Sequence, residues 1–313
     1  MGRTLIIGNG FDLDLGLNTS YRDFAKSDLW PIGYQEQKES FLAQKLQADS
    51  YENWFDLENS LCEYAQEKKR SKKTADPVNL VGTKGDLEIF HLVEDALFKF
   101  ISNHQKIQPN KDSIAARVLK AIVANGKFNK VLSFNYTDLN DIAFKLGLGK
   151  IEYSHVHGSC LGGHIVLGVS DDYSLRKGYE EFYKTNNTHY HSPNVRYALQ
   201  GIEEVVFFGH SLGSQDFHYF SDFFYGQSIG GMKEDDSIRI TFFTKDETSQ
   251  QSLKAQLRGM MNQRMNNFMD NNIVNFIRTQ EGDSKELNEF LAHLSKTSLA
   301  ADRHRMASLA SML

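Results

Sequence analysis

Short apolar runs and longer segments with helical periodicity alternate over most of this chain. The runs are rich in Val, Ile, Leu and Phe, as expected for strands that are covered on both faces. Strands that alternate with helices predict an α/β fold with a parallel, Rossmann-like sheet. The predicted strands are 5–7, 131–134, 151–156, 164–169, 204–209, 238–243 and 273–277, and the predicted helices among them are about 214–225, 247–269 and 286–296.

The segment between the first two predicted strands, residues 22–125, does not follow this alternation, because its pattern is mainly helical. Good helix formers fill 35–69, and helical spacing returns from Asp86 to His104. The apolar positions of the first part predict one buried stripe, which consists of Phe41, Leu42, Leu46, Trp54, Leu57 and Leu61. We therefore expect a helical insertion at 22–125 within the α/β fold.

Three polar segments complete the predicted organisation. The charge run at 68–73 suits a solvated helix end or loop, and a proline with two glycines predicts a loop at 76–85. The end of the chain, 298–313, is small and polar and is expected to be loose. Without repeats or a low-complexity linker, the whole chain, 1–313, is expected to form a single domain that includes the insertion.

Composition excludes several classes of function. The net charge of -5 gives no basic footprint, so we expect no affinity for nucleic acid. The two cysteines, Cys62 and Cys160, argue against a disulfide scaffold and against a four-thiolate zinc site. The chain shows neither a cationic leader with a long apolar core nor an apolar run of membrane-spanning length. We therefore expect a cytoplasmic protein with no membrane partner.

A glycine-spaced turn, Gly8-Asn9-Gly10, follows the first strand and leads towards a helix. Such a turn exposes backbone N–H groups at the carboxyl edge of the sheet, where nucleotide phosphates bind. The third glycine of the dinucleotide fingerprint is absent, since position 13 is Leu. The turn therefore has two interpretations, which are a phosphate site on the amides of Gly8 to Phe11 and an ordinary turn between strand and helix.

Polar residues also follow later strands. Asn135, His157 and the turn Gly209-His-Ser211 should converge with the first turn, because the carboxyl ends of parallel strands share one edge. Asn135 is either a turn residue or an amide that holds a ribose hydroxyl or a water. His155 and His157 share a face of a strand, but no acidic or cysteine ligand has a matching spacing, so no metal ion is expected. His157 is the better candidate for a general base.

The segment Gly209-His-Ser-Leu-Gly213 supports a rival hypothesis. It fits the nucleophile elbow G-x-S-x-G and lies between an apolar strand and a helix, as that motif requires. Asp246 and His293 could then complete a serine hydrolase with Ser211. Against this, His293 lies within an apolar helical pattern rather than in a loop. The alternative is a tight turn in which Ser211 and backbone amides contact a ligand, with Asp216 capping the helix.

Several stretches together resemble the AbiH family of bacteriophage abortive infection proteins. Their order and context make the match specific, and they span most of the chain. They are Gly8-Asn-Gly-Phe-Asp-Leu-Asp-Leu-Gly-Leu-Asn-Thr-Ser-Tyr-Arg-Asp-Phe24, Trp54-Phe-Asp-Leu-Glu58, Phe134-Asn-Tyr-Thr137, His155-Val-His-Gly158 and Phe208-Gly-His-Ser-Leu-Gly-Ser-Gln-Asp216.

The chain also bears a more distant resemblance to sirtuins and sirtuin-like defence NADases. The glycines of the first turn, an asparagine turn, a His-Gly pair and a late Gly-x-Ser turn follow in the same order. The matching residues are Gly8-Asn9-Gly10, Asp12, Gly16-Leu17, Asn135, His157-Gly158 and Gly209-His-Ser211. Asn9 and Asp12 replace the Ala and Ser of that pattern, and two cysteines cannot build the four-cysteine zinc module of sirtuin deacetylases.

This resemblance implies a sirtuin-like fold and cleavage of NAD, as substrate, at the nicotinamide–ribose bond. Asn135 and His157 would be catalytic, with Asn135 holding the water or the ribose and His157 accepting a proton. Asp12 or Asp14 would hold ribose hydroxyls, unless they cap the helix. The implied nucleotide-binding residues are Gly8, Asn9, Gly10, Phe11, Asp12, Thr19, Tyr136, Gly158, Gly209, Ser211 and Asp216.

Three classes of function remain at this stage. They are an NAD-cleaving antiphage enzyme, a serine hydrolase, and a nucleotide-binding sensor without turnover that acts through a partner. Unrestrained NAD cleavage would kill the host cell, so the insertion at 22–125 is a candidate for a lid, an oligomer surface or a trigger site. Self-association or a partner defence protein is expected from the resemblance.

Overall fold

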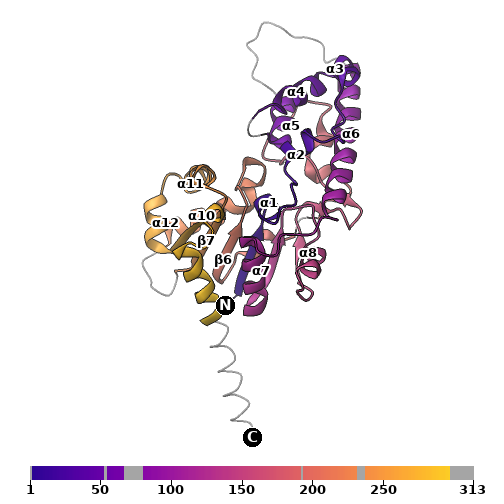
Figure 1. Cartoon of the computed structure of the whole chain (residues 1–313). Coiled ribbons are helices and arrows are strands. Elements are labelled where there is room, and N and C mark those ends of the chain that lie inside the picture. Colours follow the sequence, from indigo (N-terminus) through magenta and orange to yellow (C-terminus); the bar gives the residue numbers. More distant parts are fainter. Residues whose placement is uncertain (1, 53–54, 67–79, 192, 231–236, 297–313) are drawn as a thin grey trace.

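The structure is a computed structural model that describes residues 2–52, 55–66, 80–191, 193–230 and 237–296, with backbone only at 80–84. Within these ranges six strands form one parallel sheet with the order β3-β2-β1-β6-β7-β8. Figure 1 shows β6 and β7 of this sheet among the helices that surround it. This confirms the predicted parallel α/β fold, and the order is that of the dinucleotide-binding Rossmann fold. The strands are β1 Gly2–Ile7, β2 Phe128–Ser133, β3 Ser154–His155, β6 Ile202–Phe208, β7 Arg239–Thr244 and β8 Ile273–Arg278.

Alternate residues of the central strands enter two different cores, because successive side chains of a strand point to opposite faces. On β1, Leu5 and Ile7 belong to one core and Ile6 to the other. Phenylalanines continue the pattern across the sheet, where Phe207 stacks on Phe242 with ring centroids 5.1 Å apart. Helices therefore cover both faces and bury strands that are apolar throughout.

The first face is covered by α7 Ile114–Asn125, α8 Leu139–Lys145 and a helix at 285–296. The second is covered by α9 Val195–Ala198, α10 Phe217–Ile229, α11 Glu247–Met260 and α12 Met265–Asn271. No helix within the described ranges combines the length and apolarity needed to cross a membrane.

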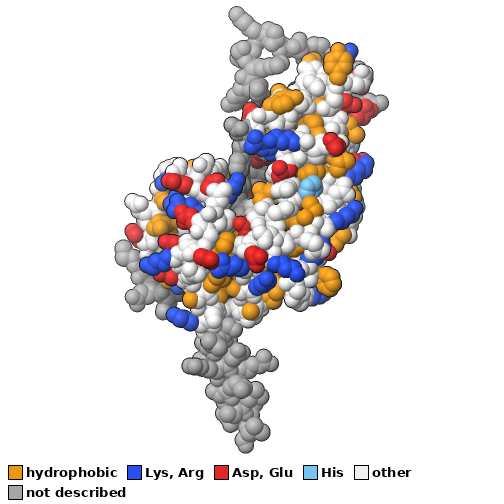
Figure 2. Space-filling model, in the orientation of Figure 1, with side chains coloured by type: hydrophobic (Ala, Val, Ile, Leu, Met, Phe, Trp, Pro, Cys, Tyr) orange, Lys and Arg blue, Asp and Glu red, His pale blue; other side chains and the backbone are white. Residues whose placement is uncertain are grey.

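The helical insertion has a core of its own beside the sheet (Figure 1). Its helices are α2 Tyr21–Ala25, α3 Tyr34–Glu39, α4 Phe41–Asp49, α5 Leu57–Ala65 and α6 Leu80–His104. Buried residues after the third strand, among them Leu167 and Phe182, complete this core. In contrast, α7 packs on the sheet as the crossover helix between β1 and β2. On the face shown in Figure 2, acidic and basic side chains are interspersed over both parts.

Several predicted boundaries were wrong. The helix expected at 247–269 is interrupted between α11 and α12, because Asn262 and Gln263 have φ of 48° and 68°, which a right-handed helix does not accommodate. The strands expected at 151–156 and 164–169 are reduced to two residues each, and the second, β5 His164–Ile165, pairs antiparallel with β4 Gly158–Ser159 outside the main sheet.

Two predictions within the insertion also need correction. Residues 80–85 of the expected loop belong to α6, where Gly85 packs closely on the backbone of Glu39. Phe41 is 71% exposed, since it is the first residue of α4, whereas Leu42, Leu46, Leu57 and Leu61 are buried as predicted. The charge run at 68–73, Trp54 and the tail 298–313 lie outside the described residues.

Candidate functional site

The site lies where the strand order reverses, between the carboxyl ends of β1 and β6. There the Gly8–Gly10 turn and the turn after β6 are in direct backbone contact. A Cβ on Gly209 would lie 2.4 Å from the carbonyl carbon of Gly10, and a Cβ on Gly8 would lie 2.6 Å from Cα of His210. These glycines are therefore needed for the close approach of two backbones.

This packing occupies most of the backbone amides of the first turn. The amide of Gly8 donates to the carbonyl of Phe208 at 3.0 Å, that of Gly10 to the carbonyl of Gly209 at 2.9 Å, and that of Phe11 to the carbonyl of Gly8 at 2.9 Å. Three of the four amides expected to hold a pyrophosphate are thus already occupied. The side chain of Phe11 is also buried, against Phe208. These contacts hold the first turn against the turn after β6, and a phosphate site there stays a prediction.

Asp12, in α1 Asn9–Asp14, is the centre of a buried polar cluster beneath this turn. Its carboxylate accepts hydrogen bonds from Thr137 at 2.7 Å, from the Asn135 amide at 2.8 Å and from Thr19 at 3.3 Å. Burial raises the pKa of Asp12 to about 6, although these three donors oppose the shift. Thr19 also donates to the exposed Asn9 at 2.7 Å, so the cluster ties the start of α1 to the end of β2.

Asn135 lies close to the first turn, as predicted, but its amide nitrogen has two protein acceptors. It donates to the carbonyl of Gly8 at 3.1 Å and to Asp12 at 2.8 Å. An amide nitrogen has two N–H groups, so neither remains for a water or a ribose. The observed contacts of this nitrogen hold the first turn against the end of β2, and a role for Asn135 in holding a water or the ribose stays a prediction.

His157 follows β3 and pairs with Asp216, the last residue of the 3₁₀ helix η3 Ser214–Asp216. The imidazole Nε2 lies 3.1 Å from Oδ1 of Asp216, and the histidine is only 4% exposed. Lys184 and His157 lower the pKa of Asp216 despite its burial, so the carboxylate is ionised and Nε2 carries the proton that it accepts. Nδ1 of His157 is then a lone-pair acceptor, and among the described residues it has no hydrogen-bond partner.

Three residues that the sequence did not single out as site residues complete this charged cluster. Lys184 lies 2.9 Å from Glu58 of the insertion, 3.7 Å from Asp216 and 3.5 Å from Nε2 of His157. Nε2 of His210 lies 3.5 Å from the other oxygen of Asp216. Burial and the charge of Lys184 lower the pKa of His157, and burial lowers the pKa of His210 to about 4. Both imidazoles are therefore neutral at neutral pH.

The polar cluster of Asp12 and the charged cluster of His157 are neighbours. The ring of Phe134 contacts both His157 and His210, with centroids 5.5 and 4.4 Å apart. The backbone of Gly8 adjoins Asn135 on one side and His210 on the other. Residues from the first turn, from the end of β2, from behind β3 and from behind β6 thus meet at one edge of the sheet, as the convergence argument predicts.

The other predicted residues have mainly local roles. Gly158 has a φ of 75°, and a Cβ there would lie 2.8 Å from the carbonyl of His164, so this glycine allows the β4–β5 pairing. The hydroxyl of Tyr136 donates to the carbonyl of Val166 at 3.3 Å, beneath the insertion. Asp14 accepts from the amide of Ala115 at the start of α7, at 2.6 Å, which favours its capping interpretation.

The serine hydrolase hypothesis fails on geometry. His293 pairs with Glu204 at the start of β6, at 3.2 Å, whereas Ser211 follows the end of the same strand. Asp246 caps α11 by accepting from the amide of Ser249 at 2.8 Å. No histidine within the described part of the chain hydrogen-bonds to the exposed Ser211.

His155 and His157 have different surroundings and do not act as a pair. The ring of His155 lies 3.0 Å from the carbonyl of Asn135 and 3.0 Å from the hydroxyl of Tyr153. Among the residues that the structure describes, no group of three or more His, Cys, Asp or Glu side chains could hold a metal ion.

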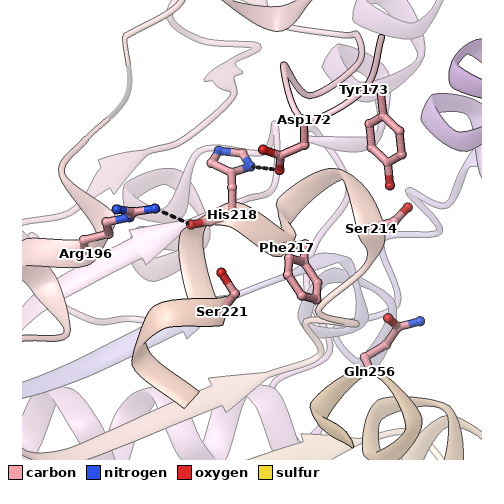
Figure 3. Close-up of a pocket in the computed structure, with 8 residues that line it drawn as sticks. All are labelled: Asp172, Tyr173, Arg196, Ser214, Phe217, His218, Ser221 and Gln256. Carbon is pink, nitrogen blue, oxygen red and sulfur yellow. Dashed lines mark hydrogen bonds and ion pairs between the residues drawn. The ribbon is translucent and has the colours of Figure 1, made fainter. Parts of the chain in front are cut away.

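An open cavity of about 440 Å³ is lined in part by Ser214 and by residues at the start of α10 (Figure 3). His218 stands at its wall, 3.6 Å from Asp172 and 3.3 Å from the hydroxyl of Ser170. Aromatic, cationic and hydroxyl groups share the lining, which consists of Asp172, Tyr173, Arg196, Ser214, Phe217, His218, Ser221 and Gln256. Its volume is within the usual range for small-molecule sites.

Sequence reasoning missed Lys184 as a site residue because it lies in an irregular segment with no motif around it. Glu58 and His210 were present in the stretches that carry the family resemblance, but no pattern predicts that they meet. Their proximity depends on how the insertion packs on the sheet edge.

One family model matches most of the chain, including the residues of the site. The family model described as bacteriophage abortive infection AbiH matches residues 4–229, a range that contains both clusters and the whole insertion. No curated protein matches the chain. The match covers well over half of the 313 residues, so the chain belongs to the AbiH family, and its role is accordingly in abortive infection, a defence against bacteriophage.

Proposed function

We propose that this AbiH protein is a defence enzyme that hydrolyses NAD at the nicotinamide–ribose bond, with His157 as the general base. The observation that carries the proposal is the pair of His157 and Asp216. The carboxylate accepts a hydrogen bond from Nε2–H at 3.1 Å, and Nδ1 remains a buried acceptor without a partner in the described chain. A histidine oriented in this way is prepared to accept a proton from water.

The reaction needs no proton donor for its leaving group. When the bond between ribose C1′ and the pyridinium nitrogen breaks, the electron pair goes to nicotinamide, which leaves as a neutral molecule. Water forms the new bond to C1′, and its proton passes to Nδ1 of His157. A positioned base of this kind typically contributes about 10²–10⁴-fold.

The position of the site supports a dinucleotide as substrate. Open sheets with this strand order bind dinucleotides at the carboxyl edge where the order reverses, which here is between β1 and β6. Three of the four amides of the first turn are occupied, so in this proposal the phosphates bind mainly elsewhere along the edge. The cavity lined by Ser214 and Phe217 offers the rings of Tyr173 and Phe217 for a base. Arg196 at its wall pairs with the exposed Asp222 at 3.1 Å and would exchange that partner for an anion.

The buried state of His157 fits an enzyme that is held inactive. Glu58 of α5 reaches across to Lys184 at 2.9 Å and closes the insertion over the charged cluster. We propose that the insertion acts as a lid and that substrate reaches Nδ1 only after it moves. Self-association or a partner defence protein would supply the trigger.

The test is incubation of the purified chain with NAD, alone and in extract of phage-infected cells, with release of nicotinamide and ADP-ribose measured by chromatography. We expect release by the wild-type chain and a loss of about 10²-fold or more in His157→Ala. His155→Ala is the matched control, because this histidine lies two positions away, contacts Tyr153, and should keep its activity.

Two results would contradict the proposal. Equal release of nicotinamide by the wild-type chain and by His157→Ala would show that His157 is not the general base. Binding of NAD without any product, in buffer and in infected extract, would instead favour a nucleotide sensor.

A further inference from the structure

Backbone hydrogen bonds hold Lys184 at the site independently of the contacts of its side chain. Its amide donates to the carbonyl of Val169 at 3.0 Å, and the amide of Val169 donates to the carbonyl of Phe182 at 2.7 Å. This close pairing requires Gly168, whose φ is 153° and where a Cβ would lie 2.4 Å from the Phe182 carbonyl oxygen. The segment is thereby held so that the lysine side chain enters the charged cluster.

The ammonium of Lys184 is almost completely buried, with a side-chain exposure of 3%. Burial alone disfavours the charged form, but the carboxylates of Glu58 and Asp216 outweigh it and raise the pKa of Lys184. The residue is therefore a permanent positive charge within 3.5 Å of Nε2 of His157 and 3.7 Å of Asp216. A buried charge at such distances acts strongly on its neighbours, because little water screens it.

We infer that Lys184 is a positioning residue for the His157–Asp216 pair: its ammonium keeps Asp216 ionised and keeps the imidazole neutral, so that Nδ1 stays free to accept a proton. The catalytic role of Lys184 rests on the proposed function. The effect of Lys184 on the protonation of His157 does not. Lys184 itself is not placed against the substrate.

Three effects decide the protonation of His157, since burial and the charge of Lys184 disfavour the imidazolium and Asp216 favours it. Asp216 stabilises an imidazolium, and without opposition this contact would favour a protonated, inactive base. Lys184 shares the same carboxylate oxygen and repels a second positive charge, so it opposes the imidazolium directly. The charged and titratable groups that act on His157 from the surrounding elements are Lys184, His210, Asp216 and His218, with the ring of Tyr219 beside it. Asp56 and Glu58 act on Lys184 and Asp216.

The experiment is an NMR titration of the His157 imidazole in the full chain, with no substrate present. The chain has 11 histidines, so the His157 signal is assigned by its loss in His157→Asn. Lys184→Met removes the charge and keeps the aliphatic stem. Lys184→Met with Glu58→Gln also removes the carboxylate that would otherwise be left buried without its partner, and so protects the fold.

We expect the titration midpoint of His157 to rise by about one pH unit or more in both variants. Lys184→Arg retains the positive charge and should leave the midpoint near its wild-type value. Lys145→Met is the matched control, because this lysine also pairs with a carboxylate, Asp141, at 2.7 Å and does not contact His157.

An unchanged midpoint in a folded double variant would overturn the inference, and so would an equal rise in Lys184→Arg. Since the titration requires no turnover, it separates this inference from the proposed function. A protein that shows the predicted rise and does not cleave NAD would refute the proposed function and leave the role of Lys184 intact.

Discussion

Nε2 of His157 lies 3.1 Å from Oδ1 of Asp216, although 59 positions separate the two residues in the chain. The contact joins the segment after β3 to the 3₁₀ helix before α10. It fixes which imidazole nitrogen carries the proton, and it therefore decides which nitrogen can act as a base.

Replacement of Asp216 tests this relationship. Asp216→Asn keeps the shape of the side chain and an oxygen that can accept from Nε2, but it removes the charge that orients and stabilises a protonated imidazole. We expect NAD cleavage to fall by about 10²–10⁴-fold with little change in KM. Glu181→Gln is the control, since Glu181 also pairs with a histidine, His91, at 3.1 Å and does not line the cavity. If Asp216→Asn cleaves NAD at a rate within a factor of about two of the wild type, the His157–Asp216 pair does not contribute to catalysis.

A pair of glycines that flank β6 tests the close packing of the two turns. Gly209 and Gly201 have similar φ values of 66° and 61°, but only Gly209 has backbone atoms where a Cβ would be. Gly201→Ala should cost about 1–2 kcal/mol for its left-handed conformation, and Gly209→Ala should cost at least about 2 kcal/mol more for the clash with Gly10. Urea unfolding measures the free energy of unfolding of both variants. Equal decreases would show that the backbone contact between Gly209 and Gly10 can relax without a loss of stability.

The buried carboxyl of Asp12 predicts a pH dependence of stability. Its pKa is raised from 3.8 to about 6 on folding, so it stabilises the fold fully below about pH 4, and that stabilisation is lost as the pH rises through about 6. The rise of this pKa from 3.8 to about 6 corresponds to about 3 kcal/mol of stability.

Asp12→Asn cannot titrate and isolates this effect. Between about pH 7.5 and pH 4, the free energy of unfolding of the wild type should increase relative to the variant by up to about 3 kcal/mol. Parallel pH curves for the two proteins would mean that the donors Thr19, Asn135 and Thr137 keep Asp12 ionised throughout.

Ser211 distinguishes this account from serine hydrolysis. The side chain is exposed, and the candidate partner His293 lies at the other end of β6 beside Glu204. We therefore expect Ser211→Ala to retain its rate of NAD cleavage within about two-fold and a fluorophosphonate probe to leave Ser211 unlabelled. Covalent labelling of this residue would restore the rival hypothesis.

The sheet was predictable from sequence because its strands are fully apolar runs such as Val205 to Phe208, and parallel pairing follows from the helices between them. The convergence of Asn135 and His157 on the first turn followed from the same parallel arrangement. The resemblance to the AbiH family is confirmed, whereas the resemblance to sirtuins stays a prediction.

The contacts within the site were less predictable, because they depend on tertiary packing that leaves no local pattern. The glycines at 8, 10 and 209 fit a phosphate turn and a backbone contact equally well in sequence, and only the structure shows which amides are occupied. Lys184 illustrates the same limit, since a lysine in an irregular segment is usually exposed and here the insertion buries it.

The most direct test of the central claim is the NAD content of bacteria that carry this gene, measured after phage infection by mass spectrometry of cell extracts. With the wild-type chain, NAD should fall and nicotinamide and ADP-ribose should rise before the cells lyse, and with His157→Ala at equal protein level NAD should stay at its value in uninfected cells. Protection against phage by the wild-type chain with undiminished NAD would contradict the account.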